Sequence, residues 1–176
     1  RAVAIGNYAA SLNQHDAAVA IGTEAGSNNQ GFSAVAVGDH AGVYDQNFQA
    51  VGVGYAAGYD NQGPSAVAIG AVAGFSNQYR DTVAIGNTTG AIYQRSNAIA
   101  VGTYAGFSNQ GYSAVAVGTN AGVWSQKITA VAIGLNAGYD YQGSGAIAIG
   151  SNAGSLQQEN NAVAVGTSAG EYYQGV

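Results

Sequence analysis

The stretch AVAVGDHAGVYDQNFQ at residues 34–49 is one copy of a 16-residue unit that fills the chain. Starting at Ala2, eleven such units follow one another without insertion or deletion, and the last ends one residue short, at Val176. The consensus is A-V-A-[IV]-G-x-x-A-G-x-x-x-Q-x-x-x, and we number its positions as columns 1 to 16 of each coil. A fixed period of this kind indicates a repeat architecture in which each unit stacks on its neighbours.

Half of the columns are nearly constant and half vary. Column 5 is Gly and column 13 is Gln in every coil, while columns 2 and 4 hold only Val or Ile. Columns 1, 3, 8 and 9 have one exception each, at Thr82, Gly52, Thr89 and Ala10. Every charged residue, both His and all aromatic residues lie in the other columns. The constant half of each coil is therefore small and apolar, and the variable half carries the bulk and the polarity.

This division predicts an all-β fold. Sixteen residues are too few for a helical hairpin, and AVAIG is a β-branched apolar run closed by Gly, which is typical of a short strand. Gly in columns 5 and 9, and in column 14 of five coils, indicates two tight turns. We expect a second, less regular strand over columns 10 to 13. The prediction is a parallel β-solenoid (β-roll) of eleven coils, a rod roughly 50 Å long at ~4.8 Å per rung.

The regular strand is apolar on both faces. Val and Ile of columns 2 and 4 point to one side and Ala of columns 1 and 3 to the other. A coil this thin can bury only one of these rows, and the sequence leaves open which one. We expect the other row to meet a second copy of the chain in a parallel homo-oligomer. The alternative is a monomer that exposes a flat row of Ala, since scattered exposed apolar residues are ordinary.

Segments such as SAVAVG, SAVAIG and NAIAVG, each followed by a turn of small residues, resemble the head repeats of trimeric autotransporter adhesins (YadA-like heads). The resemblance covers the whole chain, and similar arrays occur in viral and phage fibre proteins. It implies a left-handed β-roll, a side-by-side homotrimer and a bacterial surface location. The chain departs from the family in its longer coils and in the Gln of every coil.

The Gln column predicts a structural ladder. Gln has both a donor and an acceptor, so amides stacked in register can each bond the rung above and below, as in cross-β stacks. The alternative is a ligand-binding row. The residues are Gln14, Gln30, Gln46, Gln62, Gln78, Gln94, Gln110, Gln126, Gln142, Gln158 and Gln174.

Composition argues against several function classes. The formal net charge is −5 with four Lys and Arg, so there is no basic footprint for nucleic acid. No apolar run approaches the ~20 residues that span a bilayer, so we expect no membrane insertion in this segment. His15 and His40 fall in columns 14 and 7 of different coils, and the acids are scattered. The protein is therefore expected not to be an enzyme, and to need no metal or cofactor.

The variable columns are where binding is expected. They give a surface rich in Tyr, Asn and Ser with little charge, which suits protein or glycan partners. In column 10, covering the coil and binding a partner are equally good interpretations. The candidate adhesive residues are Tyr44, Tyr93, Trp124, Tyr141, Tyr172 and Tyr173.

These observations favour an extracellular, surface-displayed adhesive fibre with an unknown surface protein or glycan receptor. Neither end of the array has the features of a cap, so residues 2–176 are expected to be one segment of a longer fibre. A virion or phage tail fibre, displayed on the virion surface, is the alternative. An ice-binding solenoid is disfavoured because column 6 holds no regular Thr row, and a solenoid lyase or hydrolase because no polar cluster forms.

Overall fold

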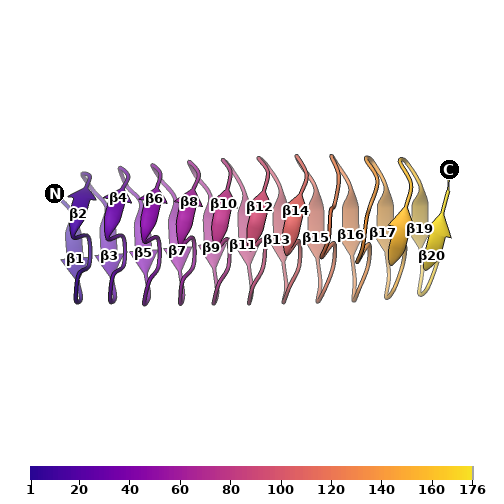
Figure 1. Cartoon of the computed structure of the whole chain (residues 1–176), viewed down its shortest axis with the longest axis horizontal. Helices are drawn as coiled ribbons and strands as arrows, with labels where there is room; N and C mark the ends of the chain where they lie inside the picture. The colour runs from indigo at the N-terminus through magenta and orange to yellow at the C-terminus, as the bar shows by residue number, and fades with distance from the viewer. Residues whose placement is uncertain (176) are drawn as a thin grey trace.

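The computed structural model describes residues 1–175 and shows a straight rod of stacked coils with the two termini at opposite ends (Figure 1). Strands and turns make up the described part of the chain, and it contains no helix. The parallel β-solenoid expected from the repeat is therefore confirmed. Val176, the last residue of the predicted array, lies outside the described residues.

Columns 2 to 4 of every coil form a strand of the first sheet, which has 11 strands in the order of the chain. All pairings are parallel, and each residue faces its equivalent one coil later, as in Val3 with Val19 and Ala4 with Ala20. The strands are β1 (Val3–Ile5), β3 (Val19–Ile21), β5 (Val35–Val37), β7 (Val51–Val53), β9 (Val67–Ile69), β11 (Val83–Ile85), β13 (Ile99–Val101), β15 (Val115–Val117), β16 (Val131–Ile133), β17 (Ile147–Ile149) and β19 (Val163–Val165).

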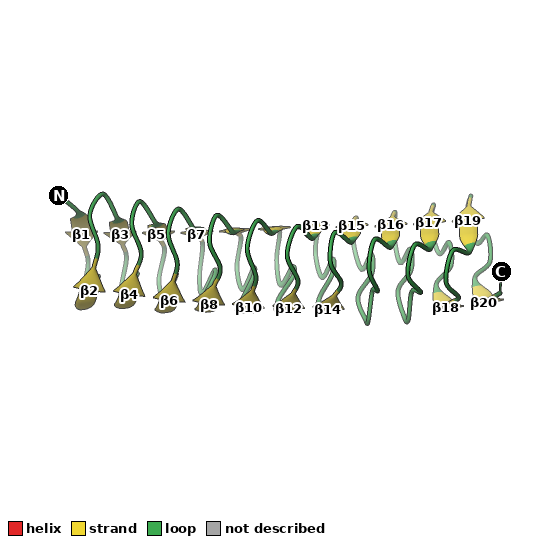
Figure 2. Ribbon diagram, turned by 90° about the horizontal axis from the view of Figure 1, so that it is seen from above, coloured by secondary structure: helices red, strands yellow, loops and turns green. Residues whose placement is uncertain are grey.

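Columns 11 to 13 form the second sheet, on the opposite side of the rod (Figure 2). This second sheet is divided into a part of seven strands and a part of two strands. In the eighth and ninth coils, which lie between the two parts, isolated bridges such as that of Gln126 with Gln142 replace regular strand pairing. The second strand is thus one residue shorter than predicted. Its strands are β2 (Leu12–Gln14), β4 (Asn28–Gln30), β6 (Tyr44–Gln46), β8 (Asp60–Gln62), β10 (Ser76–Gln78), β12 (Ile92–Gln94), β14 (Ser108–Gln110), β18 (Leu156–Gln158) and β20 (Tyr172–Gln174).

The first turn depends on the glycine of column 5. Gly102, for example, has a φ of +127°, a region that residues with a side chain scarcely populate. A Cβ on Gly102 would also lie 2.6 Å from the carbonyl oxygen of Gly118 in the next coil. The invariant column therefore reflects both an unusual backbone conformation and the close stacking of successive turns.

The second turn differs from the sequence-based expectation. The column 14 glycines, such as Gly31 and Gly63, do not have a positive φ; the left-handed residue is in column 16, as in Ser33 and Ser65. The amide of Ala34 donates to the carbonyl of Gly31 at 3.2 Å, so the glycine opens a four-residue turn. Pro64 follows Gly63 in the position that proline favours in such turns.

The interior of the rod is lined with alanine. The Ala side chains of columns 1, 3 and 8 are fully buried in almost every coil, and they form the apolar core. Thr82 and Thr89, which replace Ala, are also buried, and each hydroxyl donates to a backbone carbonyl, that of Tyr79 or of Gly102. Apart from these two threonines, each coil interior holds Ala methyl groups and the amide of one Gln.

The structure therefore settles which row fills the coil. Ala points inward, and Val and Ile of columns 2 and 4 point outward. The expectation of an exposed flat row of Ala is wrong, because the exposed row consists of the larger β-branched side chains. The reason is space: a full row of Val or Ile would add two or three carbons at every position of an interior that Ala already fills, although single β-branched residues are accommodated at Thr82 and Thr89.

Candidate functional site: outer faces and inner ladder

The Gln side chains of column 13 cross the coil interior and join the two sheets. In every coil the Gln Nε2 donates to the carbonyl oxygen of the column 2 residue of the same coil, at 2.6–2.9 Å. Gln126, for example, donates to Val115 at 2.7 Å and also to Ala130 at 3.2 Å. Each coil thus holds a buried polar bond from its second strand to its first.

The same amides also bond along the rod. Nε2 donates to Oε1 of the next Gln in eight of the ten pairs of neighbouring coils, at 3.0–3.3 Å. No such bond joins Gln62 to Gln78 or Gln94 to Gln110, and the Oε1 atoms of Gln78 and Gln110 have no partner within the described residues. The ladder expected from the sequence therefore contains two breaks.

Burial limits what these amides can contact. The column 13 residues from Gln30 to Gln158 are each at most 1% exposed, whereas Gln14 and Gln174, in the first and last coils, are partly exposed. The column 9 glycines lie against the same amides: a Cβ on Gly106 would be 2.8 Å from Oε1 of Gln110. A ligand outside the coil cannot reach such a row, so its role is to hold the coil together.

The outer face of the first sheet is a continuous apolar surface. It presents the Val and Ile side chains of columns 2 and 4 from all eleven coils, and we call it the Val/Ile face. The column 4 isoleucines of the central coils are about as exposed as one another, for example 39% for Ile69 and 38% for Ile133. Exposed apolar patches of this extent on soluble proteins mark sites of interaction.

The candidate adhesive residues lie on the other side of the rod. Tyr44, Tyr93, Trp124, Tyr141, Tyr172 and Tyr173 are all exposed and belong to columns 11 and 12 of the second-sheet side. The structure does not gather them into one patch, because they come from coils 3, 6, 8, 9 and 11. Two of them contact aromatic residues of column 10: the Trp124 and Phe107 rings meet edge to face at 5.2 Å, and Tyr44 and Tyr59 do so at 5.4 Å.

Column 10 covers the coil. Val43 and Val123 are buried, and Tyr59 and Phe75 stack in successive coils with ring centroids 4.9 Å apart. Burial, with smaller effects from Tyr44, raises the pKa of Tyr59 above its ordinary value near 10. The geometry thus favours the covering role for this column and leaves columns 11 and 12 to face solvent.

The histidines and acids stay apart. The His15 ring lies 4.7 Å from that of Phe32, tilted by 31°, whereas His40 lies 2.6 Å from Asp39 and 3.5 Å from Glu24 at the first turn. Within residues 1–175 no group of three or more His, Cys, Asp or Glu residues could hold a metal ion. The terminal ammonium of Arg1 lowers the pKa of the neighbouring Asp16 carboxyl.

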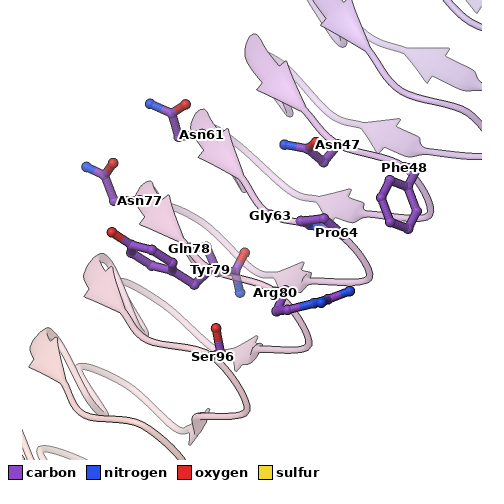
Figure 3. A pocket seen from close by; sticks show the side chains of 10 residues that line it. All are labelled: Asn47, Phe48, Asn61, Gly63, Pro64, Asn77, Gln78, Tyr79, Arg80 and Ser96. Atoms are coloured by element: carbon purple, nitrogen blue, oxygen red, sulfur yellow. The ribbon is translucent and has the colours of Figure 1, made fainter.

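Sequence reasoning missed a groove beside the second turn. Where column 14 is Gly, the wall of side chains has a gap, and a hollow of 540 Å³ opens at Gly63 and Pro64. Figure 3 shows this turn between Asn61 and Asn77 on one side and Phe48 and Arg80 on the other. The signal was present in the sequence: column 14 holds Gly in five coils and larger residues in the others, among them Tyr79 and Arg95.

No protein-family model, curated protein or solved structure matched the chain. The described residues also include no helix long and apolar enough to cross a bilayer. Functional inference therefore depends on the geometry of the coil and of its two outer faces.

Proposed function

We propose that the chain is a structural and adhesive surface fibre, in which parallel copies associate side by side as a homotrimer through their Val/Ile faces. The observation that carries this proposal is that columns 2 and 4 hold only Val or Ile in all eleven coils and point away from the core. The coil itself needs no apolar side chain there, because Ala fills its interior.

The size of the face is that of an interaction patch. Eleven rungs at ~4.8 Å and two columns ~7 Å apart give a flat footprint of roughly 370 Å² before side-chain relief is counted. That is comparable with the largest apolar patches on monomers, about 300–600 Å², and is about half of the roughly 800 Å² that each partner contributes to a standard interface. A strip this long and without any charge is costly to leave in water.

A second copy of the chain is the partner that this face fits best. Its Val and Ile side chains recur at the same rung spacing, so in a parallel arrangement each coil meets the equivalent coil of its neighbour. The resemblance to the heads of trimeric autotransporter adhesins supports three copies and a location outside the cell. Three such faces meeting at an axis would leave the second-sheet sides outermost.

The outermost side then carries the variable residues. Exposed Tyr and Trp give a large contact area at a low entropy cost, and the Asn and Ser around them offer hydrogen bonds. Three copies of a repeating surface would add many weak contacts through multivalency. The unknown partner is a surface protein or glycan, and the rigid rod holds the binding columns away from its point of attachment.

The mass of the native assembly tests this proposal. Sedimentation equilibrium should give three times the 17.5 kDa chain mass. Val117→Lys places a charge in the middle of the Val/Ile face and should yield folded monomers, as judged by circular dichroism. Tyr44→Lys, the matched control on the second-sheet side, should remain trimeric. A monomeric wild type, or a Val117→Lys variant that assembles like the wild type, would contradict the proposal.

A further inference from the structure

The basic residues of this acidic chain are concentrated at one edge. Of the four Lys and Arg, three lie in columns 14 and 15: Arg80, Arg95 and Lys127, from coils 5, 6 and 8. The fourth is Arg1, and the net charge of the whole chain is −5. The overall composition is acidic, so it does not by itself explain why three of the four basic residues lie along one edge of the rod.

These cations are largely free to bind an anion. Asp81 is the one acid in columns 12 to 16 between residues 50 and 145, and it lies 3.5 Å from the Arg80 Nε. Arg95 and Lys127 form no salt bridge with a carboxylate within residues 1–175. The other carboxylates of columns 12 to 16 lie beyond the two ends of this strip, at Asp16, Asp45 and Glu159.

The strip lies along a row of adjoining hollows. Three hollows of 540, 240 and 470 Å³ follow one another, the first two sharing Tyr79 and the last two sharing Arg95 and Asn109. Gly63 and Gly111 leave gaps in the wall of the first and third hollows. We call this the basic groove. Each larger hollow has a volume in the range of small-molecule sites, about 300–1,000 Å³.

Aromatic faces and amides line the groove together with the cations. The Arg95 guanidinium lies 5.3 Å from the centre of the Tyr112 ring, and the Lys127 ammonium 5.2 Å from that of Tyr141. Such contacts orient the cations before any ligand arrives. Tyr79 and Tyr112 are 49% and 43% exposed, so their rings remain accessible. Asn77 and Asn109 place amide groups at the same edge.

We propose that the basic groove binds a linear anionic polysaccharide. Sugar faces would lie on Tyr79 and Tyr112, the carboxylate or sulfate groups would pair with Arg95 and Lys127, and the Asn amides would bond hydroxyl groups. This inference rests on the proposed function, since it names the chemical class that the adhesive surface binds.

The geometry favours a polysaccharide over other polyanions. The groove runs along the rod for about four rungs, or ~19 Å, and it changes little in direction. Three cations over that length would neutralise few of the phosphates of a nucleic acid, whose affinity depends on such contacts. The exposed Tyr rings and Asn amides suit a ligand that presents apolar ring faces and hydroxyl groups together.

Calorimetric titration of the full chain tests the proposal. An oligogalacturonate hexamer and a heparin hexasaccharide are the anionic probes, and neutral dextran is the uncharged one. Both anionic probes should bind more tightly than dextran, and their association constants should fall as salt rises. The tighter of the two assigns carboxylate or sulfate as the preferred group. Equal binding of dextran would overturn the role of charge.

Substitutions locate the site. Arg95→Gln combined with Lys127→Gln should lower the association constant about tenfold or more, and Tyr112→Ala about fivefold, in line with stacking and charge-assisted contacts. Arg1→Gln and Phe32→Ala are matched controls, since Phe32 is an exposed aromatic of the same column 15 outside the groove. The controls should bind like the wild type, and all four variants should keep its mass. Unchanged binding by the double variant would overturn the proposal.

Two further outcomes separate this inference from the proposed function. Poly-glutamate or single-stranded DNA binding as tightly as the hexasaccharides would overturn the assignment to a polysaccharide. A trimer that binds none of the probes would overturn the groove and leave the assembly standing. A monomer that binds them through Arg95 and Lys127 would support the groove and contradict the assembly.

Discussion

Each coil of the rod contributes one segment to each of the two sheets, but the two sheets differ in how regularly these segments pair as strands. The first sheet has 11 strands without interruption, and the second is divided into seven and two strands with a gap at residues 123–142. In the first sheet every strand residue is constant or nearly so, whereas the second-sheet strands share only their Gln.

The difference shows where the fold is encoded. In the second-sheet strands Gln is the residue that is shared by all coils, while the other two are more exposed in most of them, as in β6, where Tyr44 and Asp45 are exposed and Gln46 is buried. The residues at those two positions differ from coil to coil, and in two of the coils the segment does not form a regular strand. The constant columns therefore determine the conformation of the coil, and the variable columns determine the side chains on its outer surface.

The strongest test of the constant half is Gly102→Ala. The φ of +127° and the 2.6 Å approach of the new Cβ to the Gly118 carbonyl should cost about 3 kcal/mol in the free energy of unfolding. Urea denaturation measures the loss. Thr103→Ala, one residue later in the same turn, should change the free energy by less than about 0.5 kcal/mol. Equal effects of the two substitutions would show that the turn can rearrange.

The ladder gives the next largest effect. Gln126 donates to Val115, Ala130 and Gln142 and accepts from Gln110, so Gln126→Met removes buried bonds in the region where the second sheet is interrupted. We expect a loss of about 2–3 kcal/mol from groups left without partners. Gln174→Met, in the partly exposed last coil, should cost less than half as much in the same denaturation experiment. A reversed order would mean that the ladder adds little to the central coils.

The smallest expected effect concerns the gap in the second sheet. The backbone amide of Tyr141 donates to the Asp140 carboxylate at 2.9 Å, and such local bonds compete with pairing between strands. Asp140→Ser introduces the residue that occupies this column in β10 and β14. Hydrogen exchange of the Tyr141 amide should become slower, with a stability change within about 0.5 kcal/mol.

Asp60→Ser is the control for that experiment. Asp60 occupies the same column in β8, but its carboxylate accepts from the Asn61 side chain and not from the backbone. Exchange of the Asn61 amide should therefore stay the same. If Asp140→Ser leaves the exchange of Tyr141 unchanged as well, the local bond is not what interrupts the sheet.

The sequence alone predicts the period, the parallel stacking and the strand over columns 2 to 4, because these depend on composition that repeats in every coil. It does not predict that Ala and not Val or Ile fills the coil, because that depends on the distance between two sheets. The left-handed residue of the second turn, exemplified by Ser65, was also missed, since serine carries no strong signal for that conformation.

The basic groove escaped prediction for a different reason. Arg80, Arg95 and Lys127 are far apart in the chain and occupy two different columns, so a column-by-column reading of the sequence does not connect them. Stacking at one rung per coil places them along one edge. The gaps at Gly63 and Gly111 become hollows only once the neighbouring coils supply Tyr79 and Lys127 as walls.

The direction of the bonds between glutamines gives the rod a polarity. In every one of these bonds the Nε2 donor belongs to the earlier coil and the Oε1 acceptor to the later one, from Gln14 to Gln174. The amide dipoles of the row are therefore aligned, and the two ends of the stack differ in chemistry. A coil stacked beyond Gln174 would meet a donor, and one stacked before Gln14 would meet an acceptor. Coils can continue the row head to tail, whereas two like ends would bring donor against donor or acceptor against acceptor.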